Sequence, residues 1–226
     1  MTEVPPAYHR YRRQEEIADR CIHLLGIGLG IGAALALLYL AALRGESRLV
    51  IATAVYALGL VAMLTCSAFY NLAPPSARKE LLRRFDHAAI FAMIAGTYTP
   101  FLLVRMGGAW GWGMLGFVWL TGAAGIGLAL ARPRRFERLQ LAAYLLLGWS
   151  ILLARGPLAN SVSWPAIMLL LAGGLLYSFG VIFHLWRRLG YHDAIWHGFV
   201  LAAASCHYAA VLLGVVLPAL SSSLVD

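Results

Sequence analysis

The sequence predicts an all-α fold, a bundle of seven transmembrane helices with the N-terminus in the cytoplasm and the C-terminus outside. Hydrophobic residues make up 61% of the 226 positions and charged residues 12%, whereas a soluble domain carries about 25% charged residues. Apolar runs long enough to span a bilayer recur along the chain, and Lys and Arg gather in alternate connections between them. This combination excludes a soluble enzyme, a disordered chain and a disulfide-stabilised scaffold.

Seven apolar runs account for most of the chain. A helix needs roughly 17 to 25 apolar residues to cross a hydrocarbon layer about 30 Å thick. We assign spans to residues 21–43, 49–73, 85–104, 109–131, 139–154, 163–186 and 194–217. The fifth, LQLAAYLLLGWSILLA, is short and marginal on length alone. We therefore predict a cytoplasmic segment 1–20, a transmembrane domain 21–217 and a short external tail 218–226.

The distribution of basic residues determines the predicted orientation. Fourteen of the 18 Lys and Arg residues lie in the N-terminal segment and in the second, fourth and sixth connections, and four lie elsewhere. Because cytoplasmic loops carry the excess of Lys and Arg, we expect the N-terminus in the cytoplasm. This alternation requires an odd number of spans, which favours seven over six. It predicts a multi-pass protein of the cell (inner) membrane.

The net charge of +8 does not indicate a nucleic-acid partner, because the basic residues are separated by apolar spans and form no single basic surface. Cys21, Cys66 and Cys206 fall within apolar segments, and no pair has the CxxC spacing typical of zinc or redox sites. We expect these cysteines to be small buried residues.

Glycines at 26, 28, 30 and 32 form the one biased stretch of the sequence. A phosphate-binding loop needs a strand, a turn and a helix N-terminus, and these glycines lie within the first span. The small-xxx-small pairs Gly26/Gly30 and Gly28/Gly32 instead favour close approach of a neighbouring helix. The same glycine face would permit a homodimer.

Eight polar residues are predicted to lie near the cytoplasmic ends of the spans. An ionisable group in a bilayer costs roughly 2.5 to 3.5 kcal/mol on insertion scales, which makes each one a functional candidate. Interface anchors and satisfied helix contacts are the alternatives. Because five helices contribute to one layer, a polar cavity is favoured over scattered anchors. The eight are His23, Ser67, Asn71, Asp86, His87, His184, Asp193 and His197.

The spacing of some of these residues indicates a metal site. Asn71 follows Ser67, and His197 follows Asp193, by four positions, so each pair shares a helix face about 6 Å apart along the axis. Zinc accepts histidine and carboxylate ligands and keeps an open position for water when it is catalytic. Asp193 and His197 could supply two ligands, with Asn71 as a weak third.

Asp86 supports two interpretations. It could complement the dipole at the start of its helix and pair with Arg83 or Arg84, or it could orient a metal-bound water or a ligand histidine. His207 lies ten residues beyond His197, about 15 Å along a helix. We expect His207 to be a packed or hydrogen-bonded residue nearer the middle of the membrane.

The segment GTYTP, residues 96–100, lies deeper in the third span. Proline lacks a backbone N–H and therefore frees a carbonyl in the preceding turn. We expect a kink there, with a structural role.

Four segments together resemble the hemolysin III proteins of the progestin and adipoQ receptor superfamily, and the resemblance covers nearly all of the chain. They are EEIADRCIH entering the first span, SAFYN ending the second, RRFDHAAIFAMIAGTYTPF forming the third and DAIWHGFVLAAASCHYAAV forming the seventh. This resemblance implies seven spans with a cytoplasmic N-terminus. Eukaryotic relatives resemble intramembrane lipid amidases of the ceramidase type, which implies a zinc near the cytoplasmic side.

The resemblance implies specific ligands for that zinc: one histidine of a Ser-x-x-x-His motif on helix 2 and two of a His-x-x-x-His motif on helix 7, with a helix 3 aspartate nearby. Ser67, Asp86 and His197 match the serine, the aspartate and the second helix 7 histidine. Asn71 and Asp193 stand where the other two histidines are implied. His192 is one position out of register, a rotation of about 100° on a helix.

The polar residues and the family resemblance together support two functions of different classes, and we favour a non-catalytic function over an enzymatic one. A non-catalytic protein of this kind binds membrane lipids in its polar cavity and acts in membrane-lipid homeostasis or sensing. The alternative is a zinc-dependent hydrolase of a lipid amide or ester, in which Asn71, Asp193 and His197 hold zinc, Asp86 takes a proton from water and Ser67 supports the oxyanion. A third interpretation is the membrane-lysing activity that the family name suggests, although the sequence contains no amphipathic pore hairpin.

Overall fold

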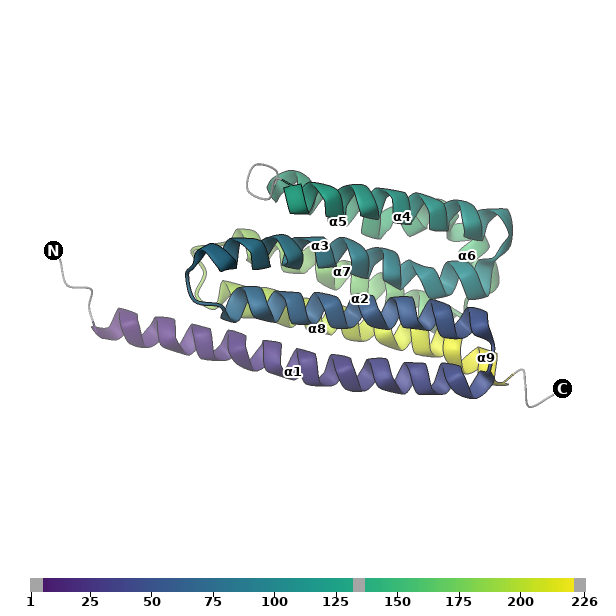
Figure 1. The fold of residues 1–226 in the computed structure, drawn as a ribbon, viewed down its shortest axis with the longest axis horizontal. Helices are drawn as coiled ribbons and strands as arrows, with labels where there is room; N and C mark the ends of the chain where they lie inside the picture. The colour runs from purple at the N-terminus through teal and green to yellow at the C-terminus, as the bar shows by residue number, and fades with distance from the viewer. Residues whose placement is uncertain (1–5, 132–136, 222–226) are drawn as a thin grey trace.

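A computed structural model describes residues 6–131 and 137–221, and its regular elements in these ranges are all helices (Figure 1). Seven helical segments are long and apolar enough to cross a membrane: Arg13–Arg44, Ser47–Leu72, Ala77–Met106, Gly108–Ala131, Glu137–Ser161, Trp164–Leu185 and His192–Ala219. The predicted all-α fold with seven spans is confirmed, including the fifth span that was marginal on length.

The spans are built from nine α-helices and three segments of other helix types within the described ranges. In chain order they are α1 (Pro6–Arg44), α2 (Ser47–Leu72), α3 (Ala77–Pro100), the π-helix η1 (Phe101–Met106), α4 (Gly108–Ala131), α5 (Glu137–Trp149), the 3-10 helix η2 (Ser150–Ala154), α6 (Arg155–Ser161), α7 (Trp164–Leu185), α8 (His192–Val211), the π-helix η3 (Leu212–Val216) and α9 (Leu217–Ser221).

The long helices lie side by side along one direction (Figure 1). α2 packs between α1 and α3, α4 packs on α3, α7 packs on α8, and α8 returns to contact α1. The helix α1 begins at one end of the bundle and α9 lies at the other (Figure 1). We call the end at which α1 begins the N-side. The starts of α3, α5 and α8 and the ends of α2 and α7 also lie there.

The first helix runs without a break across residue 20, where we expected the cytoplasmic segment to end. Its segment Arg13–Arg44 is long and apolar enough to cross a membrane, so Asp19 belongs to the same helical segment as His23. Residues 132–136 of the fourth connection and residues 222–226 of the predicted external tail lie outside the described residues.

The GTYTP segment changes the helix type of the third span. Pro100 is the last residue of α3, and the chain continues as the wider π-helix η1. The hydroxyl of Thr97 donates to the carbonyl of Met93, and that of Thr99 to Ala95, each at 2.8 Å. Because each hydroxyl bonds to a carbonyl of its own helix, Thr97 and Thr99 leave no unpaired hydroxyl donor within the bundle.

Tyr98 stabilises a second irregular segment, the 3-10 helix that interrupts the fifth span. Its hydroxyl lies 2.9 Å and 2.7 Å from the carbonyl oxygens of Leu147 and Gly148, and it accepts from the backbone N–H of Ile151 at 2.8 Å. Ser150 Oγ is 3.1 Å away. Because irregular backbone within a bilayer needs protein partners, Tyr98 both satisfies this break and joins α3 to the fifth span.

The glycines of the first span face two directions. A Cβ at Gly26 or Gly30 would contact Leu64 of α2, whereas Gly28 and Gly32 have nothing within 4 Å among the described residues. The first pair therefore allows close packing against α2 as predicted, and the homodimer stays a prediction.

The expectation that the cysteines are buried is wrong for Cys21, which is exposed because it lies on an outward face of α1. Cys66 and Cys206 are half-buried.

His207 is a packed, hydrogen-bonded histidine, as predicted. Its Nε2 donates to the carbonyl of Leu170 at 3.2 Å, which joins α8 to α7. A Cβ at Gly173 would lie 2.3 Å from Cδ2 of this imidazole. The absence of a side chain at Gly173 is therefore what allows the ring to lie between the two helices.

We expect Gly173→Ala to destabilise the bundle by about 1–3 kcal/mol, because the added methyl group overpacks the contact with His207. Thermal unfolding in detergent measures the effect. Gly127→Ala is the matched control, since a Cβ there meets nothing within 4 Å and alanine favours a helix over glycine by about 1 kcal/mol. Equal unfolding temperatures for the two variants would contradict this account.

Candidate functional site at the N-side of the bundle

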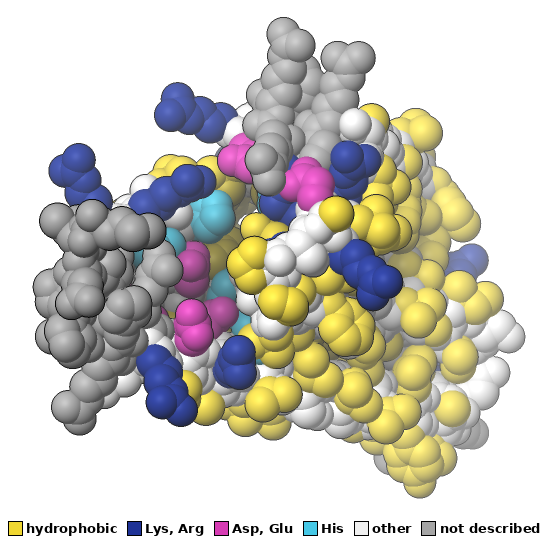
Figure 2. Space-filling view, turned by 60° about the vertical axis from the view of Figure 1, so that its left-hand side comes forward, with side chains coloured by type: hydrophobic (Ala, Val, Ile, Leu, Met, Phe, Trp, Pro, Cys, Tyr) yellow, Lys and Arg dark blue, Asp and Glu magenta, His cyan; other side chains and the backbone are white. Residues whose placement is uncertain are grey.

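A cavity of about 1340 Å³ lies among the helices. It is lined by all eight of the polar residues that were predicted from the sequence to lie near the cytoplasmic ends of the spans. Figure 2 shows His, Asp and Glu side chains in a hollow of the N-side face, with Lys and Arg around it. Most of the other lining residues are apolar, among them Met93, Phe101, Leu158 and Ile167, although Arg155 of α6 and His207 of α8 also line the cavity. The cavity therefore joins a polar end to a mostly apolar interior.

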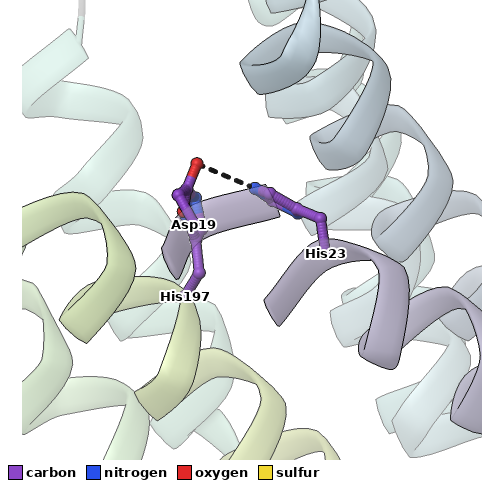
Figure 3. Close-up of side chains that lie close together, drawn as sticks. All are labelled: Asp19, His23 and His197. Carbon is purple, nitrogen blue, oxygen red and sulfur yellow. Dashed lines mark hydrogen bonds and ion pairs between the residues drawn. The ribbon is translucent and has the colours of Figure 1, made fainter. Parts of the chain in front are cut away.

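Asp19, His23 and His197 meet at the polar end of this cavity (Figure 3). Asp19 Oδ1 is 2.6 Å from His197 Nδ1, and Asp19 Oδ2 is 3.4 Å from His23 Nε2. The two imidazole rings lie 4.4 Å apart, centre to centre. His23 is 6% exposed and His197 9%. Asp19 and His23 are one turn apart on α1, and His197 is on α8, so the cluster joins the first span to the last.

Asn71 links His197 to α2. Its Nδ2 is 3.4 Å from His197 Nε2, and it also donates to the backbone carbonyl of Ser67 at 2.9 Å and to Ser67 Oγ at 3.3 Å. If Nδ1 of His197 donates to the Asp19 carboxylate, Nε2 accepts from Asn71. Both ring nitrogens then have a partner, which determines the tautomer and orientation of the imidazole.

Asp86 faces the same cluster from α3. It interacts electrostatically with His87, His197 and His23 and with the hydroxyl of Ser67. The two arginines considered as its partners bond elsewhere. Arg83 pairs with Glu80 at 2.9 Å and with Glu137 of α5, and Arg84 donates to the carbonyl of Leu130 at 3.1 Å. These contacts favour a role for Asp86 within the cluster over an ion pair at the start of its helix.

His87 connects α3 to α5. Its Nδ1 is 2.9 Å from Oε1 of Gln140, and the hydroxyl of Tyr144 donates to the backbone carbonyl of His87 at 3.1 Å. Gln140 and Tyr144 also line the cavity. The polar end is thus closed on one side by hydrogen bonds between side chains of two spans.

Among the described residues, Asp193 makes no hydrogen bond or ion pair with the other two predicted metal ligands. Its Oδ1 is 3.1 Å from Nδ1 of His192, and its side chain is 60% exposed. It occupies the first turn of α8, where an acidic side chain complements the helix dipole. Of the set Asn71, Asp193 and His197, Asn71 and His197 are hydrogen-bonded to each other. His184, at the end of α7, lies against Trp196, with ring centres 5.3 Å apart.

Two residues of this site, Asp19 and Gln140, were not predicted from the sequence. Asp19 was assigned to the segment before the first span, although its four-residue spacing from His23 is the same signal that was used for Asp193 and His197. Gln140 is the one amide side chain of residues 139–154, and no four-residue spacing connects it to another polar candidate. The position of either one relative to His197 or His87 depends on contacts between distant spans.

The chemistry of Asp19, His23 and His197 fits a divalent metal ion. Two imidazoles and a carboxylate form a common donor set for zinc, and their ligand atoms all lie within 4.8 Å of one another. His23 Nε2 is buried and makes no hydrogen bond of acceptable geometry to any described residue, although Asp19 Oδ2 is 3.4 Å away. A metal ion would satisfy this nitrogen.

Comparison with known proteins decides the family. The model of the family described as "Haemolysin-III related" matches residues 11–208. The chain belongs to the hemolysin III family. It is 38% identical over 203 residues to "Hemolysin-3" of Bacillus cereus, which covers 90% of this chain and 93% of that one. No solved structure matches the chain.

This hemolysin III protein is also similar to a second bacterial protein and to a human protein. It is 35% identical over 199 residues to "Hemolysin-3 homolog" of Bacillus subtilis (strain 168), covering 88% of this chain and 93% of that one. It is 30% identical over 167 residues to the human "Monocyte to macrophage differentiation factor", covering 70% and 67%. The family and the seven spans together establish a multi-pass membrane protein.

We expect zinc binding to depend on Asp19 and His23 and not on Asp193. Detergent-purified protein is dialysed against zinc, and the bound metal is then measured by elemental analysis. Asp19→Ala and His23→Ala should lower the zinc content at least tenfold, because each removes a ligand atom from the cluster. Asp193→Ala is the matched control and should retain it. The reverse pattern would favour the Asn71, Asp193 and His197 set.

Proposed function

We propose that this hemolysin III protein binds a membrane lipid in its cavity and acts in membrane-lipid homeostasis or sensing. The observation that carries the proposal is the polarity of the cavity, in which ionisable and amide side chains gather at the N-side and most side chains farther in are apolar. A membrane lipid has the same order of parts, with a polar headgroup above apolar chains. The cavity volume of about 1340 Å³ exceeds the roughly 300–1,000 Å³ of typical ligand pockets, which leaves room for a molecule as large as a lipid.

The distribution of basic residues supports the inner leaflet as the source of the lipid. The connections at the N-side carry fourteen of the 18 Lys and Arg residues, and such an excess is typical of the cytoplasmic side. The polar end of the cavity would then lie at the level of the headgroups of the cytoplasmic leaflet.

We expect Gly148→Trp to lower the amount of co-purified lipid severalfold. Gly148 lines the cavity and has nothing within 4 Å of a Cβ built on it, so an indole there would occupy space that a lipid chain needs. Lipid extracted from purified protein is quantified by mass spectrometry. Gly127→Trp, on α4 and outside the cavity lining, is the control. Unchanged lipid in Gly148→Trp would contradict the proposal.

A zinc-dependent lipid hydrolase is the second candidate, and the Asp19, His23 and His197 cluster beside Asp86 favours it. These three residues would hold the metal, which polarises a carbonyl group and acidifies water when bound. Asp86 is placed to take up a proton, and the Ser67 hydroxyl to donate a hydrogen bond to a developing oxyanion.

The hydrolase hypothesis predicts that zinc-supplemented protein releases fatty acid from ester or amide lipids. Asp86→Asn should then lower the release at least about 10²-fold while lipid binding persists, because the amide cannot take up the proton. Asp193→Asn serves as the control. Absence of release by the wild type, measured by mass spectrometry, would overturn the hydrolase and leave lipid binding in place.

A further inference from the structure

Gln140 is a buried residue of α5 whose amide oxygen is hydrogen-bonded and whose amide nitrogen is not, among the described residues. It is 1% exposed, and its Oε1 is 2.9 Å from His87 Nδ1. Because an amide oxygen only accepts, the imidazole is the donor in this bond. Nε2 of Gln140 is buried and has no hydrogen-bond partner among the described residues. A buried donor left unpaired costs about 1–3 kcal/mol, so this group indicates an acceptor that binds there.

The unpaired amide is held in a defined orientation. His87 Nδ1 holds its oxygen, and the hydroxyl of Tyr144 holds the backbone carbonyl of His87 at 3.1 Å. Gln140, His87 and Tyr144 all line the cavity, and Leu141 and Leu145 of the same helix continue its lining with apolar side chains. The donor therefore lies where the polar end of the cavity meets the apolar interior.

The depth of Gln140 matches one part of a membrane lipid. The ion pair between Glu137 of α5 and Arg83 of α3 belongs to the polar end of the cavity, and Gln140 lies about one turn farther along α5, about 4.5 Å along the helix. In a bilayer, the interfacial region separates the headgroups from the hydrocarbon core, and the ester or amide carbonyl groups of lipids lie there. A neutral N–H donor at this level suits a neutral carbonyl acceptor.

We propose that Nε2 of Gln140 donates a hydrogen bond to the ester or amide carbonyl of the lipid bound in the cavity. This inference rests on the proposed function, since it names the part of the lipid that the site recognises. Gln140 would select lipids with a carbonyl linkage over ether-linked lipids that have the same headgroup and chains.

The test compares two probes, a diacyl phosphatidylcholine and the dialkyl ether analogue with equal chain lengths. Their affinities for the detergent-purified protein are measured by competition against a fluorescent lipid. We expect the wild type to bind the diacyl lipid about fivefold more tightly, the value of one neutral hydrogen bond. Gln140→Leu should bind both equally. Thr97→Val, which alters a cavity residue bonded only within its own helix, should keep the preference.

The outcomes separate this inference from the proposed function. Equal affinities in the wild type, or a preference that persists in Gln140→Leu, would overturn the role of Gln140 while lipid binding stands. Binding of neither probe would overturn the proposed function itself. A measurement independent of any variant is the infrared band of a ¹³C-labelled ester carbonyl. It should shift to lower frequency on binding to the wild type, and an unshifted band would overturn the inference.

Discussion

The contact between the Asp19 carboxylate and the His197 imidazole is the interaction on which the N-side of the bundle depends. Its 2.6 Å bond joins the first span to the last, and Asn71 extends it to α2. A charged group within a bilayer costs several kcal/mol unless it is paired, so these side chains have to face one another. The same pairing orients His197 and brings it into electrostatic contact with Asp86, which is why the polar residues of four helices form one site.

The need for internal hydrogen bonds also explains the irregular segments deeper in the bundle. The third span changes from α-helix to π-helix after Pro100, and the fifth contains a 3-10 segment. The Tyr98 hydroxyl contacts backbone groups of the fifth span that its interruption leaves available. The walls of the cavity therefore depend on a tyrosine that we expected to be only part of a kink.

The Asp19, His23 and His197 cluster differs from the ligand set that the family resemblance implies, and the difference lies in which helix contributes the side chains beside His197. Asn71 and Asp193 replace two implied histidines; Asn71 becomes a hydrogen-bond donor to His197, and Asp193 pairs with His192. Asp19 and His23 of α1 occupy the position beside His197 instead. A carboxylate and an imidazole one turn apart can offer a metal the same kinds of ligand atom from another helix.

The sequence by itself determined the number and approximate bounds of the spans and the layer in which the polar residues lie, because hydropathy, basic connections and helix length are local properties of the chain. Ser67, Asn71, Asp86 and His197 could be named from spacing and resemblance. Only the tertiary structure decided that Asp19 meets His197, that Asp193 turns to His192, and that Gln140 bonds His87. Each of these depends on how distant helices are rotated against one another, and that rotation is set by the packing and pairing of the whole bundle.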